Sequence, residues 1–394
     1  MIEGLQQFLA NQFTFSVLLG IVALGAIMTA VAYAIWLERK ISAWTQDRYG
    51  PNRVGPFGLL QPVADGLKFL LKEDIIPNNV DRGLFIFAPW MIFVVALVGF
   101  AIIPWGGEFR WSWMPDSAKP LAAQVASIDI GLLYLVAVAS LGVYGVVLGG
   151  WASNNKYSFY GGMRAAAQML SYEVPMGMAI FTAVLTTGFL RLEEQIDWQA
   201  AHDWTVLYHP LAALILFTTA LAESNRMPFD LAESEQELVG GYHTEYSALK
   251  LALFFLAEYA HMMTSSALMI SMFFGGYRIP GWDWLNTSPT AGAMLMRLVA
   301  FGFKIFLFIC MYMLIRWTIP RFRFDQLMRL AWKSLVPMTM VIAAWQGVIL
   351  FMGWPQWTSL PANILVLIVA GYFGLASGKP VTGRQRSLPP VQWA

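Results

Sequence analysis

The sequence predicts an all-α membrane protein, a polytopic bundle of eight to nine transmembrane helices with one amphipathic helix on the cytoplasmic surface. Of the 394 residues, 58% are hydrophobic and only 12% are charged, whereas soluble proteins carry about 25% charged residues. The apolar residues gather into long runs between short polar loops, and a run of about 20 apolar residues can cross a bilayer as a helix. These observations exclude a soluble enzyme.

The runs follow one another without a soluble-like segment, so we expect residues 1–394 to form a single membrane domain. The net charge of +1 offers no basic surface for nucleic acid. Cys310 is the single cysteine, which excludes an internal disulfide and leaves no thiolate set for an iron–sulfur cluster or a structural zinc. We therefore expect no metal and no redox centre in this chain.

Nine apolar stretches are candidates for membrane spans. The first follows polar residues rather than a basic segment and precedes no small-residue cleavage site, so we expect a retained anchor and not a signal peptide. The ninth is shorter, and it decides between eight and nine spans. The stretches cover approximately residues 13–37, 84–104, 124–149, 165–190, 206–222, 248–274, 293–315, 335–353 and 362–377.

The orientation follows from the lysines and arginines of the connections, because these residues are enriched on the cytoplasmic side. The connections after the first, third, fifth and seventh spans hold 16 of them, and the opposite connections hold five. This distribution predicts an N-terminus outside. If the ninth stretch spans, the tail with Lys379, Arg384 and Arg386 also lies on the cytoplasmic side.

One connecting segment, residues 58–72, has the pattern of a helix. Apolar residues recur at helical spacing opposite Asp65, Lys68 and Lys72. This pattern predicts an amphipathic helix on the membrane surface. The alternative is a solvated linker in which the periodicity arises by chance.

Acidic residues are concentrated between the fifth and sixth spans. A solvated acidic loop accounts for Glu235 and Glu233, but not for Glu223, which closes an apolar run, or for Glu258, which lies inside one. An ion at such depth costs about 3 kcal/mol or more, and carboxylates found there usually line a polar cavity. The seven acids of this region are Glu223, Asp230, Glu233, Glu235, Glu237, Glu245 and Glu258, against the cations Arg226 and Lys250.

Two further charges fall inside spans. Glu173 lies two residues before Pro175, which removes a helix hydrogen bond next to the acid. Lys304 lies alone in an apolar run. A structural Lys–Glu pair between helices is one interpretation. The other is a proton relay, because desolvated carboxylates near one another titrate as a coupled set near neutral pH.

The histidines add little to this prediction. His243 and His261 would lie about 27 Å apart along a helix and cannot share one haem. His202 and His209 fall in an outside loop, where we expect solvated side chains. No internal repeat of the kind found in secondary transporters is visible.

Five long segments resemble the H subunit of the proton-pumping NADH:quinone oxidoreductase, respiratory complex I. The resemblance covers about residues 13–353, and residues 354–394 form an extension with room for one extra helix. The segments are LERKISAWTQDRYGPNRVGPFGLLQPVADGLKFLLKED (37–74), GWASNNKYSFYGGMRAAAQMLSYEVP (150–175), ESNRMPFDLAESEQELVGGYHTEYS (223–247), LFFLAEYA (253–260) and RWTIPRFRFDQLMRLAWKSLVP (316–337).

The resemblance implies a quinone tunnel and a chain of carboxylates. In that family, the first inside loop and the later acidic loop form the membrane wall of the quinone tunnel, at the junction with the hydrophilic arm. The tunnel and junction residues would here be Arg39, Arg48, Arg53, Phe57, Arg316, Arg321 and Arg323. The carboxylates that relay protons would be Glu173, Glu223, Asp230, Glu233, Glu237 and Glu258.

The implied protein is one component of an H⁺-translocating NADH:quinone reductase in the bacterial cytoplasmic membrane. Quinone is its substrate, no cofactor is covalently bound, and its partners are the quinone-site subunits of the hydrophilic arm, neighbouring membrane subunits and lipid. Three alternatives stay open at this point: the related component of a membrane-bound hydrogenase or ferredoxin-linked complex, a stand-alone ion transporter, and a structural anchor for a soluble redox arm.

Overall fold

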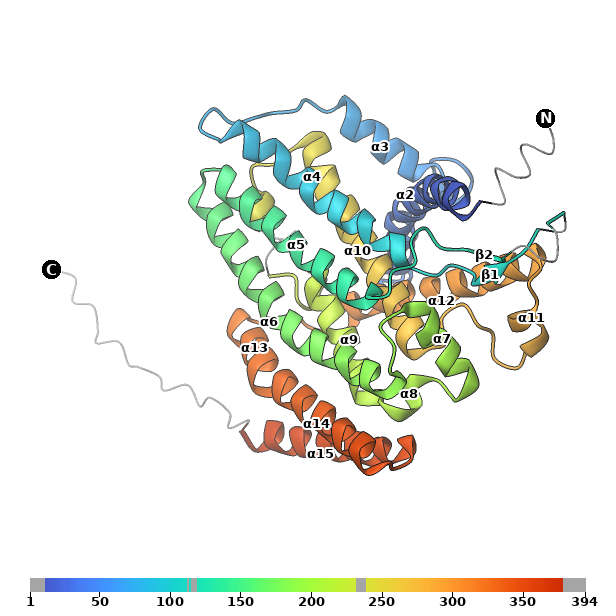
Figure 1. Ribbon diagram of the computed structural model, residues 1–394. Helices are drawn as coiled ribbons and strands as arrows, with labels where there is room; N and C mark the ends of the chain where they lie inside the picture. Colours follow the sequence, from blue (N-terminus) through green and yellow to red (C-terminus); the bar gives the residue numbers. More distant parts are fainter. Residues whose placement is uncertain (1–10, 112, 115–118, 232–238, 378–394) are drawn as a thin grey trace.

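The computed structural model of the chain describes residues 11–111, 113–114, 119–231 and 239–377. Nearly all regular structure in this part is helical, and long helices run between two ends at which shorter elements and loops gather (Figure 1). The predicted fold class, a polytopic helical membrane protein, is confirmed.

Within the described residues, seven helices are long and apolar enough to cross a bilayer, and each coincides with a predicted span. In the most apolar 18 residues of α10, 78% of the residues are buried inside the chain, whereas in those of α2 only 11% are. Helix α10 is therefore central and α2 peripheral. The helices are α2 (Gln12–Thr45), α4 (Arg82–Val98) with the 3-10 turn η2 (Gly99–Ile102), α5 (Gly131–Ala152), α6 (Lys156–Thr187), α10 (Ala248–Phe273), α12 (Ala291–Thr318), and α13 (Phe324–Arg329) continued through the π-helical η4 (Leu330–Leu335) into α14 (Val336–Met352).

The two remaining predicted spans are also helices, but shorter ones. The fifth is α9 (Pro210–Glu223), whose 14 residues rise about 21 Å, less than the roughly 30 Å of a bilayer core. The ninth is α15 (Ser359–Ser377), which packs beside α14 (Figure 1). The C-terminal extension therefore contains the extra helix for which its length leaves room.

One end of the bundle collects the connections that the charge rule assigns to the cytoplasm. We call it the charged end; its described loops are residues 46–81, 153–155, 224–231, 239–247 and 319–323. Three contacts tie neighbouring segments of this end together. Lys250 pairs with Asp74 at 2.5 Å, the Asn155 amide donates to Glu245 at 2.5 Å, and the Asp81 N–H donates to the Ala152 carbonyl at 3.2 Å.

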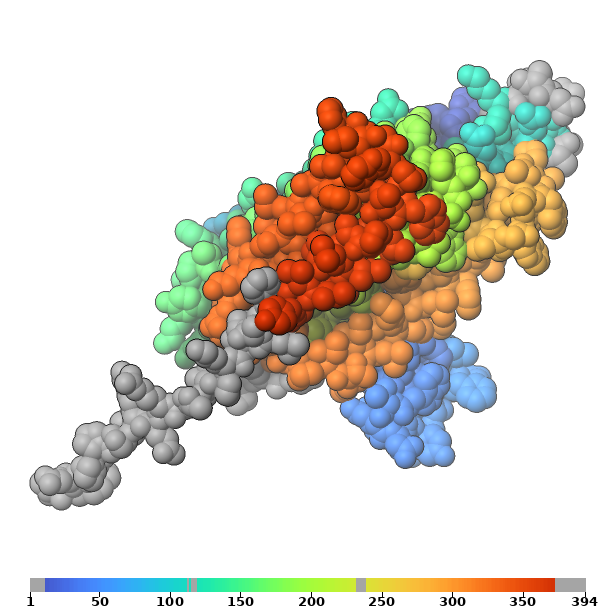
Figure 2. Space-filling view, turned by 90° about the horizontal axis from the view of Figure 1, so that it is seen from below, coloured from blue at the N-terminus to red at the C-terminus, as the bar shows by residue number. Residues whose placement is uncertain are grey.

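The predicted surface helix is α3 (Gln61–Leu71), at the charged end, preceded by the 3-10 turn η1 (Pro56–Gly58). No residue of α3 is buried, and Leu67 and Leu70 are 53% and 67% exposed. An ion pair of 2.7 Å between Arg39 and Asp65 ties α3 to the end of α2. Figure 2 shows α3 standing away from the body of the bundle. Its apolar face is therefore open to a partner or to lipid.

The opposite end carries short elements that the apolar pattern did not predict. Strands β1 (Glu108–Phe109) and β2 (Leu121–Ala122) pair antiparallel, and this pairing, with Gln124 donating to the carbonyls of Ile102 and Ala126, delays the start of α5 to residue 131 instead of the predicted 124. The other elements are α7 (Leu192–Ala201), α8 (Thr205–Tyr208) and α11 (Asp283–Thr287).

Helix α6 begins nine residues earlier than predicted, at Lys156 rather than 165. The Asn155 side chain caps it by accepting from the Tyr157 N–H at 2.9 Å. The first turns contain small residues that allow close packing: a Cβ at Gly161 would lie 2.6 Å from the backbone of Gly241. Residues 156–164, which the apolar pattern left in a loop, therefore form the first turns of α6 and pack closely against the segment at Gly241.

Candidate functional site

A cluster of paired ions is buried at the charged end. Glu38, on the last turns of α2, is 7% exposed. One of its carboxylate oxygens pairs with the Arg226 Nη1 at 2.6 Å and accepts from the Tyr259 hydroxyl at 2.7 Å. The other oxygen pairs with Arg316 of α12. Three helices and the loop after α9 therefore meet at one carboxylate.

Arg226 joins this carboxylate to a second one. Its Nε lies 2.5 Å from Glu258 Oε1 on α10, and its guanidinium lies over the Tyr259 ring, 4.1 Å from the ring centre. We call Glu38, Arg226, Glu258, Tyr259 and Arg316 the Glu38 cluster. Two acids balance two arginines in it, which is how ions are tolerated when burial removes their hydration.

Gln168 of α6 holds the loop that carries Arg226. This fully buried side chain donates to the carbonyls of Ala222 (2.8 Å) and Phe229 (2.9 Å), at the two ends of the turn. Between them Asn225 has φ 50°, a left-handed conformation that asparagine adopts more readily than most residues. The turn directs Arg226 towards α2 and α10.

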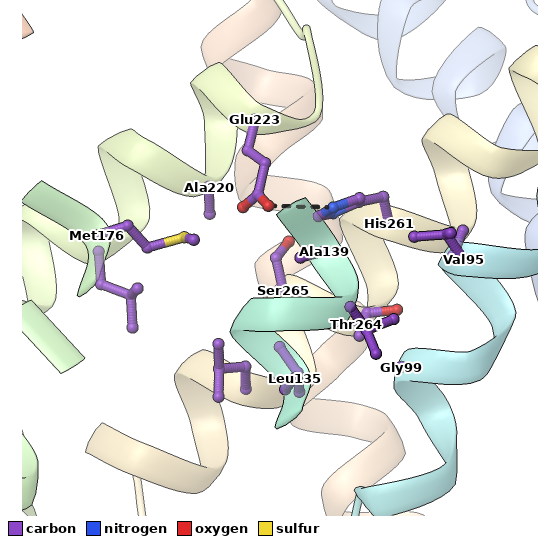
Figure 3. A pocket seen from close by; sticks show the side chains of 14 residues that line it. Val95, Gly99, Leu135, Ala139, Met176, Ala220, Glu223, His261, Thr264 and Ser265 are labelled. Carbon is purple, nitrogen blue, oxygen red and sulfur yellow. Dashed lines mark ion pairs between the residues drawn. The ribbon is translucent and has the colours of Figure 1, made fainter. Parts of the chain in front are cut away.

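A second acid lies deeper, one element away. Glu223, at the end of α9, is 7% exposed and pairs with His261 Nε2 at 3.4 Å. His261 follows Glu258 by three residues on α10, and residues at this spacing share one face of a helix. Figure 3 shows the carboxylate and the imidazole facing each other beside Ser265.

Two cavities adjoin this pair. One, of about 30 Å³, is lined by Gly99, Leu135, Met176, Glu223, His261 and Ser265, among others. The second, of about 40 Å³, is lined by Asn225, Tyr242, Glu258, His261 and Glu223, among others. These volumes count the space open to the centre of a water molecule, and roughly 10–15 Å³ of such space is enough to hold one water molecule. Water can therefore stand between the Glu38 cluster and Glu223.

Glu173 lies further along the same path. It is half-buried on α6, which continues as a helix through Pro175. It lies near the Ser140 hydroxyl of α5 and within electrostatic range of Glu223. Three acids predicted from the sequence, Glu173, Glu223 and Glu258, are thus brought together.

The remaining predicted acids are less defined. Asp230 is 4% exposed, and Arg321 donates to its backbone carbonyl. Glu233, Glu235 and Glu237 lie outside the described residues. In the described part of the chain, no group of three or more His, Cys, Asp or Glu side chains is arranged to hold a metal ion.

The predicted tunnel and junction residues divide into two sets. Arg316 and Arg321 are partly buried; Arg316 pairs with the Glu38 carboxylate, and Arg321 donates to the backbone carbonyl of Asp230. The others lie on the surface of the charged end: Arg39 pairs with Asp65, Phe57 is 78% exposed, and Arg48, Arg53 and Arg323 are also exposed. Arg39, Arg48, Arg53 and Phe57 lie at the end of α2 and in the loop before α3, whereas Arg323 directly precedes α13.

Four ionisable residues of the site were not among the predicted site residues: Glu38, Arg226, Tyr259 and His261. Arg226 was predicted only as a cation of the acidic region. Tyr259 and His261 follow the predicted Glu258 by one and three residues, and Glu38 is an acid near the end of an apolar helix. The helical spacing of Glu258 and His261 is a usable signal. In the sequence, His261 was considered only as a haem ligand.

One open interpretation and one predicted environment differ from the structure. Among the described residues, Lys304 has no carboxylate partner; its Nζ donates to the carbonyls of Phe274, Gly276 and Arg278 at 2.8–2.9 Å, where α10 ends. A cation is favourable at the C-terminus of a helix. His209 is not solvated; it is 1% exposed. His202 is exposed as predicted.

The fold and the site together define a polytopic helical membrane protein with buried ionisable groups at one end of its bundle. The NADH dehydrogenase family model matches residues 18–347. The chain therefore belongs to the NADH dehydrogenase family. The match ends within α14, so α15 lies beyond it.

Relatives support the same assignment, and the three described here are H subunits of NADH-quinone oxidoreductases. The chain is 50% identical to the H subunit numbered 1 of Cytophaga hutchinsonii over 309 residues, which are 78% of this chain and 89% of the relative. It is 46% identical to the H subunit of Flavobacterium psychrophilum over 334 residues, 84% of this chain and 96% of the relative. The H subunit of Leptospira biflexa is 46% identical over 319 residues, covering 79% and 88%.

Proposed function

We propose that this chain is the membrane subunit of an H⁺-translocating NADH:quinone oxidoreductase. In this proposal it forms the membrane wall of the quinone tunnel together with the hydrophilic arm. It also couples quinone reduction to proton translocation through buried carboxylates.

One observation carries the proposal: acidic groups continue from the charged end into the bundle with room for water between them. The series runs from the Glu38 cluster past the 40 Å³ cavity to Glu223 and His261, and on to Glu173. A structural anchor does not require such a series. Buried carboxylates that are coupled to one another and reached by water are suited to exchange protons.

The charged end also suits a quinone. A quinone has a long apolar tail and a polar head, so its site needs an apolar opening that leads to polar donors. The uncovered face of α3 supplies apolar surface. Phe57, in the loop before α3, adds an exposed ring held at φ 55°, a conformation that costs energy and is found mainly where the surroundings require it.

Proton coupling follows from charge. Reduction of quinone to quinol takes up two protons, and a change of charge at the head group shifts the proton affinity of nearby carboxylates. The Glu38 cluster is balanced only while both acids and both arginines are ionised. A new charge beside the cluster therefore alters this balance. Glu258 then gains or loses a proton, which it exchanges with Glu223 across the cavity that both residues line.

The same proposal covers location and partners. We place the chain in the bacterial cytoplasmic membrane with its charged end on the cytoplasmic side, because that end carries most of the lysine and arginine. The hydrophilic-arm subunits would cover α3 and the exposed Arg48, Arg53 and Arg323. Neighbouring membrane subunits and lipid would surround the bundle.

The test replaces Glu258 and Glu223 by glutamine, one at a time, in the intact complex. Glutamine has almost the same shape but cannot release a proton near neutral pH. We expect quinone-dependent NADH oxidation and proton translocation to fall about tenfold or more, while NADH oxidation by a hydrophilic artificial acceptor stays normal.

The matched control is Glu194→Gln at the opposite end, where Glu194 forms a surface pair with Arg191 at 3.3 Å. This variant should match the unsubstituted complex in both assays. Unchanged quinone turnover and pumping in both buried variants, at normal subunit content, would overturn the proposed function.

A further inference from the structure

The Glu223–His261 pair has an unusual hydrogen-bonding state for buried groups. Within the part of the chain that the structure describes, His261 Nδ1 is a buried atom without a hydrogen-bond partner, and Glu223 Oε1 makes no hydrogen bond of normal geometry although it faces His261 Nε2. Buried polar atoms are nearly always hydrogen-bonded, and an exception calls for an unplaced water or a functional reason. The 3.4 Å contact between Glu223 and the other ring nitrogen, Nε2, is loose for an ion pair.

His261 is also placed between the two cavities. It lines both cavities, as Glu223 does, whereas Glu258 lines only the cavity nearer the Glu38 cluster and Ser265 only the other. About 20% of its side chain is open, compared with 7% for Glu223. A proton that moves from one cavity to the other must therefore pass the imidazole or the carboxylate beside it.

The charged and titratable groups around His261 come from several elements. Glu223 faces it from α9 and Glu258 precedes it on α10. Tyr242 lines the cavity nearer the cluster, and Tyr312 of α12 reaches Ser265 at 3.3 Å on the other side. Among the described residues that line the two cavities, His261 is the only one that can carry a positive charge.

We propose that His261 is a proton-carrying residue that transfers protons between the Glu38 cluster and Glu223. The proposal rests on the proposed function and names a further member of its relay. Imidazole suits this position because it can accept a proton on one nitrogen and release one from the other, and it does so near neutral pH.

The transfer balances as two proton movements without electrons. Protonated Glu258 gives its proton to a water molecule in the adjacent cavity, and that water gives a proton to neutral His261. The Glu258 O–H bond breaks, an N–H bond forms on His261, and the water molecule is left unchanged. The resulting imidazolium is held by the Glu223 carboxylate. The Nε2–H bond then breaks and an O–H bond forms on Glu223, which leaves His261 neutral and the proton one step closer to Glu173.

The test is His261→Asn in the intact complex, with His202→Asn as the matched control. Asparagine can still donate to Glu223 but cannot carry a proton. We expect quinone-linked turnover and pumping to fall about tenfold or more in His261→Asn and to stay normal in His202→Asn, whose ring is exposed and stacks on Trp198.

Two further measurements separate proton transfer from a structural role. In His261→Ala, added imidazole should restore turnover, because the small side chain leaves space beside the existing cavities; the same addition should not restore Glu223→Gln. In the unsubstituted complex, infrared difference spectra on quinone reduction should contain bands that shift with ¹⁵N-imidazole-labelled histidine and are lost in His261→Asn or His261→Gln.

The outcomes distinguish this inference from the function on which it rests. Normal turnover in His261→Asn, together with strong loss in Glu258→Gln, would overturn the role of His261 and keep the proposed function. Normal turnover in both would overturn the proposed function as well. A defect in His261→Ala that imidazole does not relieve, without the histidine bands, would make His261 a structural partner of Glu223.

Discussion

The two ends of the bundle bury polar groups in different ways. At the charged end, the Glu38 cluster buries two acids and two arginines as ion pairs. At the opposite end, His209 Nε2 lies 2.8 Å from the Thr186 hydroxyl, and its Nδ1 lies 3.4 Å from the Asn363 amide. Ser359 donates to the Tyr208 carbonyl beside them at 2.8 Å. We call this second group, His209, Thr186, Asn363, Ser359 and Tyr208, the His209 cluster.

The difference concerns what each cluster can do. The His209 cluster joins α6, α8 and α9 to α15 through an imidazole, hydroxyls and an amide, and such bonds hold helices together without any change of charge. The Glu38 cluster holds ions next to cavities. Its energy depends on the charge of every member, so it can respond to a charge that appears nearby. We therefore expect substitutions at the charged end to affect quinone-linked turnover as well as stability, and those at the opposite end to affect stability alone.

The largest expected effect is that of Arg226→Met. Removing this guanidinium leaves Glu38 with one arginine and takes away the 2.5 Å partner of Glu258, and breaking a buried pair costs about 3–5 kcal/mol. We expect reduced subunit content in membranes and a lower unfolding temperature of the purified complex.

A double variant sharpens this test. Arg226→Met combined with Glu258→Gln removes one positive and one negative charge, so it should recover part of the lost stability without recovering quinone turnover. If Arg226→Met alone had normal stability, the ion pairs of the cluster would contribute little, and the contrast between the two ends would fail.

An intermediate effect is expected for Phe57→Ala. The ring is exposed in a loop of the charged end, so its loss should leave folding intact and lower quinone-dependent NADH oxidation several-fold, mainly through a higher KM for quinone. Trp284→Ala is the comparison at the opposite end, because Trp284 is 66% exposed. Equal losses with quinone and with an artificial acceptor would indicate misassembly instead of a tunnel defect.

The smallest effect is expected for Asn363→Leu in the His209 cluster. Asn363 is 2% exposed and lies beside His209, and a hydrogen bond between membrane helices contributes about 0.6 kcal/mol on average and up to about 1.7 kcal/mol. The unfolding temperature should fall slightly while quinone turnover stays normal. Ile364→Leu, on an exposed neighbour, is the control. Lost turnover in Asn363→Leu at full subunit content would show that this end also takes part in chemistry.

The spans could be predicted from the sequence because each depends mainly on its own residues. Helix α10 was predicted at 248–274 and runs from Ala248 to Phe273. The cost of placing a side chain in a bilayer is set largely by that side chain, so a window of neighbouring residues contains most of the information. The same reasoning identified Glu223 and Glu258 as buried, since it needs only their position within apolar runs.

Contacts between distant segments could not be predicted in this way. Glu38 looks like an ordinary helix-end acid in the sequence, and its partners Arg226 and Arg316 are 188 and 278 residues away along the chain. His209 was expected in water, but Asn363 of α15, 154 residues later, packs against it. A pair between Lys304 and an acid was one open interpretation, but the end of α10 presents three carbonyl groups to this lysine.

The sequence alone therefore determined which residues can enter the membrane, because the free energy of transfer from water to an apolar environment belongs to each side chain separately. How the buried polar groups are paired was decided only by the packing of the helices. A buried charge or imidazole is stable only with a partner at hydrogen-bonding distance, and no local pattern specifies which distant segment brings that partner. The Glu38 cluster, the Glu223–His261 pair and the cavities between them are products of tertiary structure.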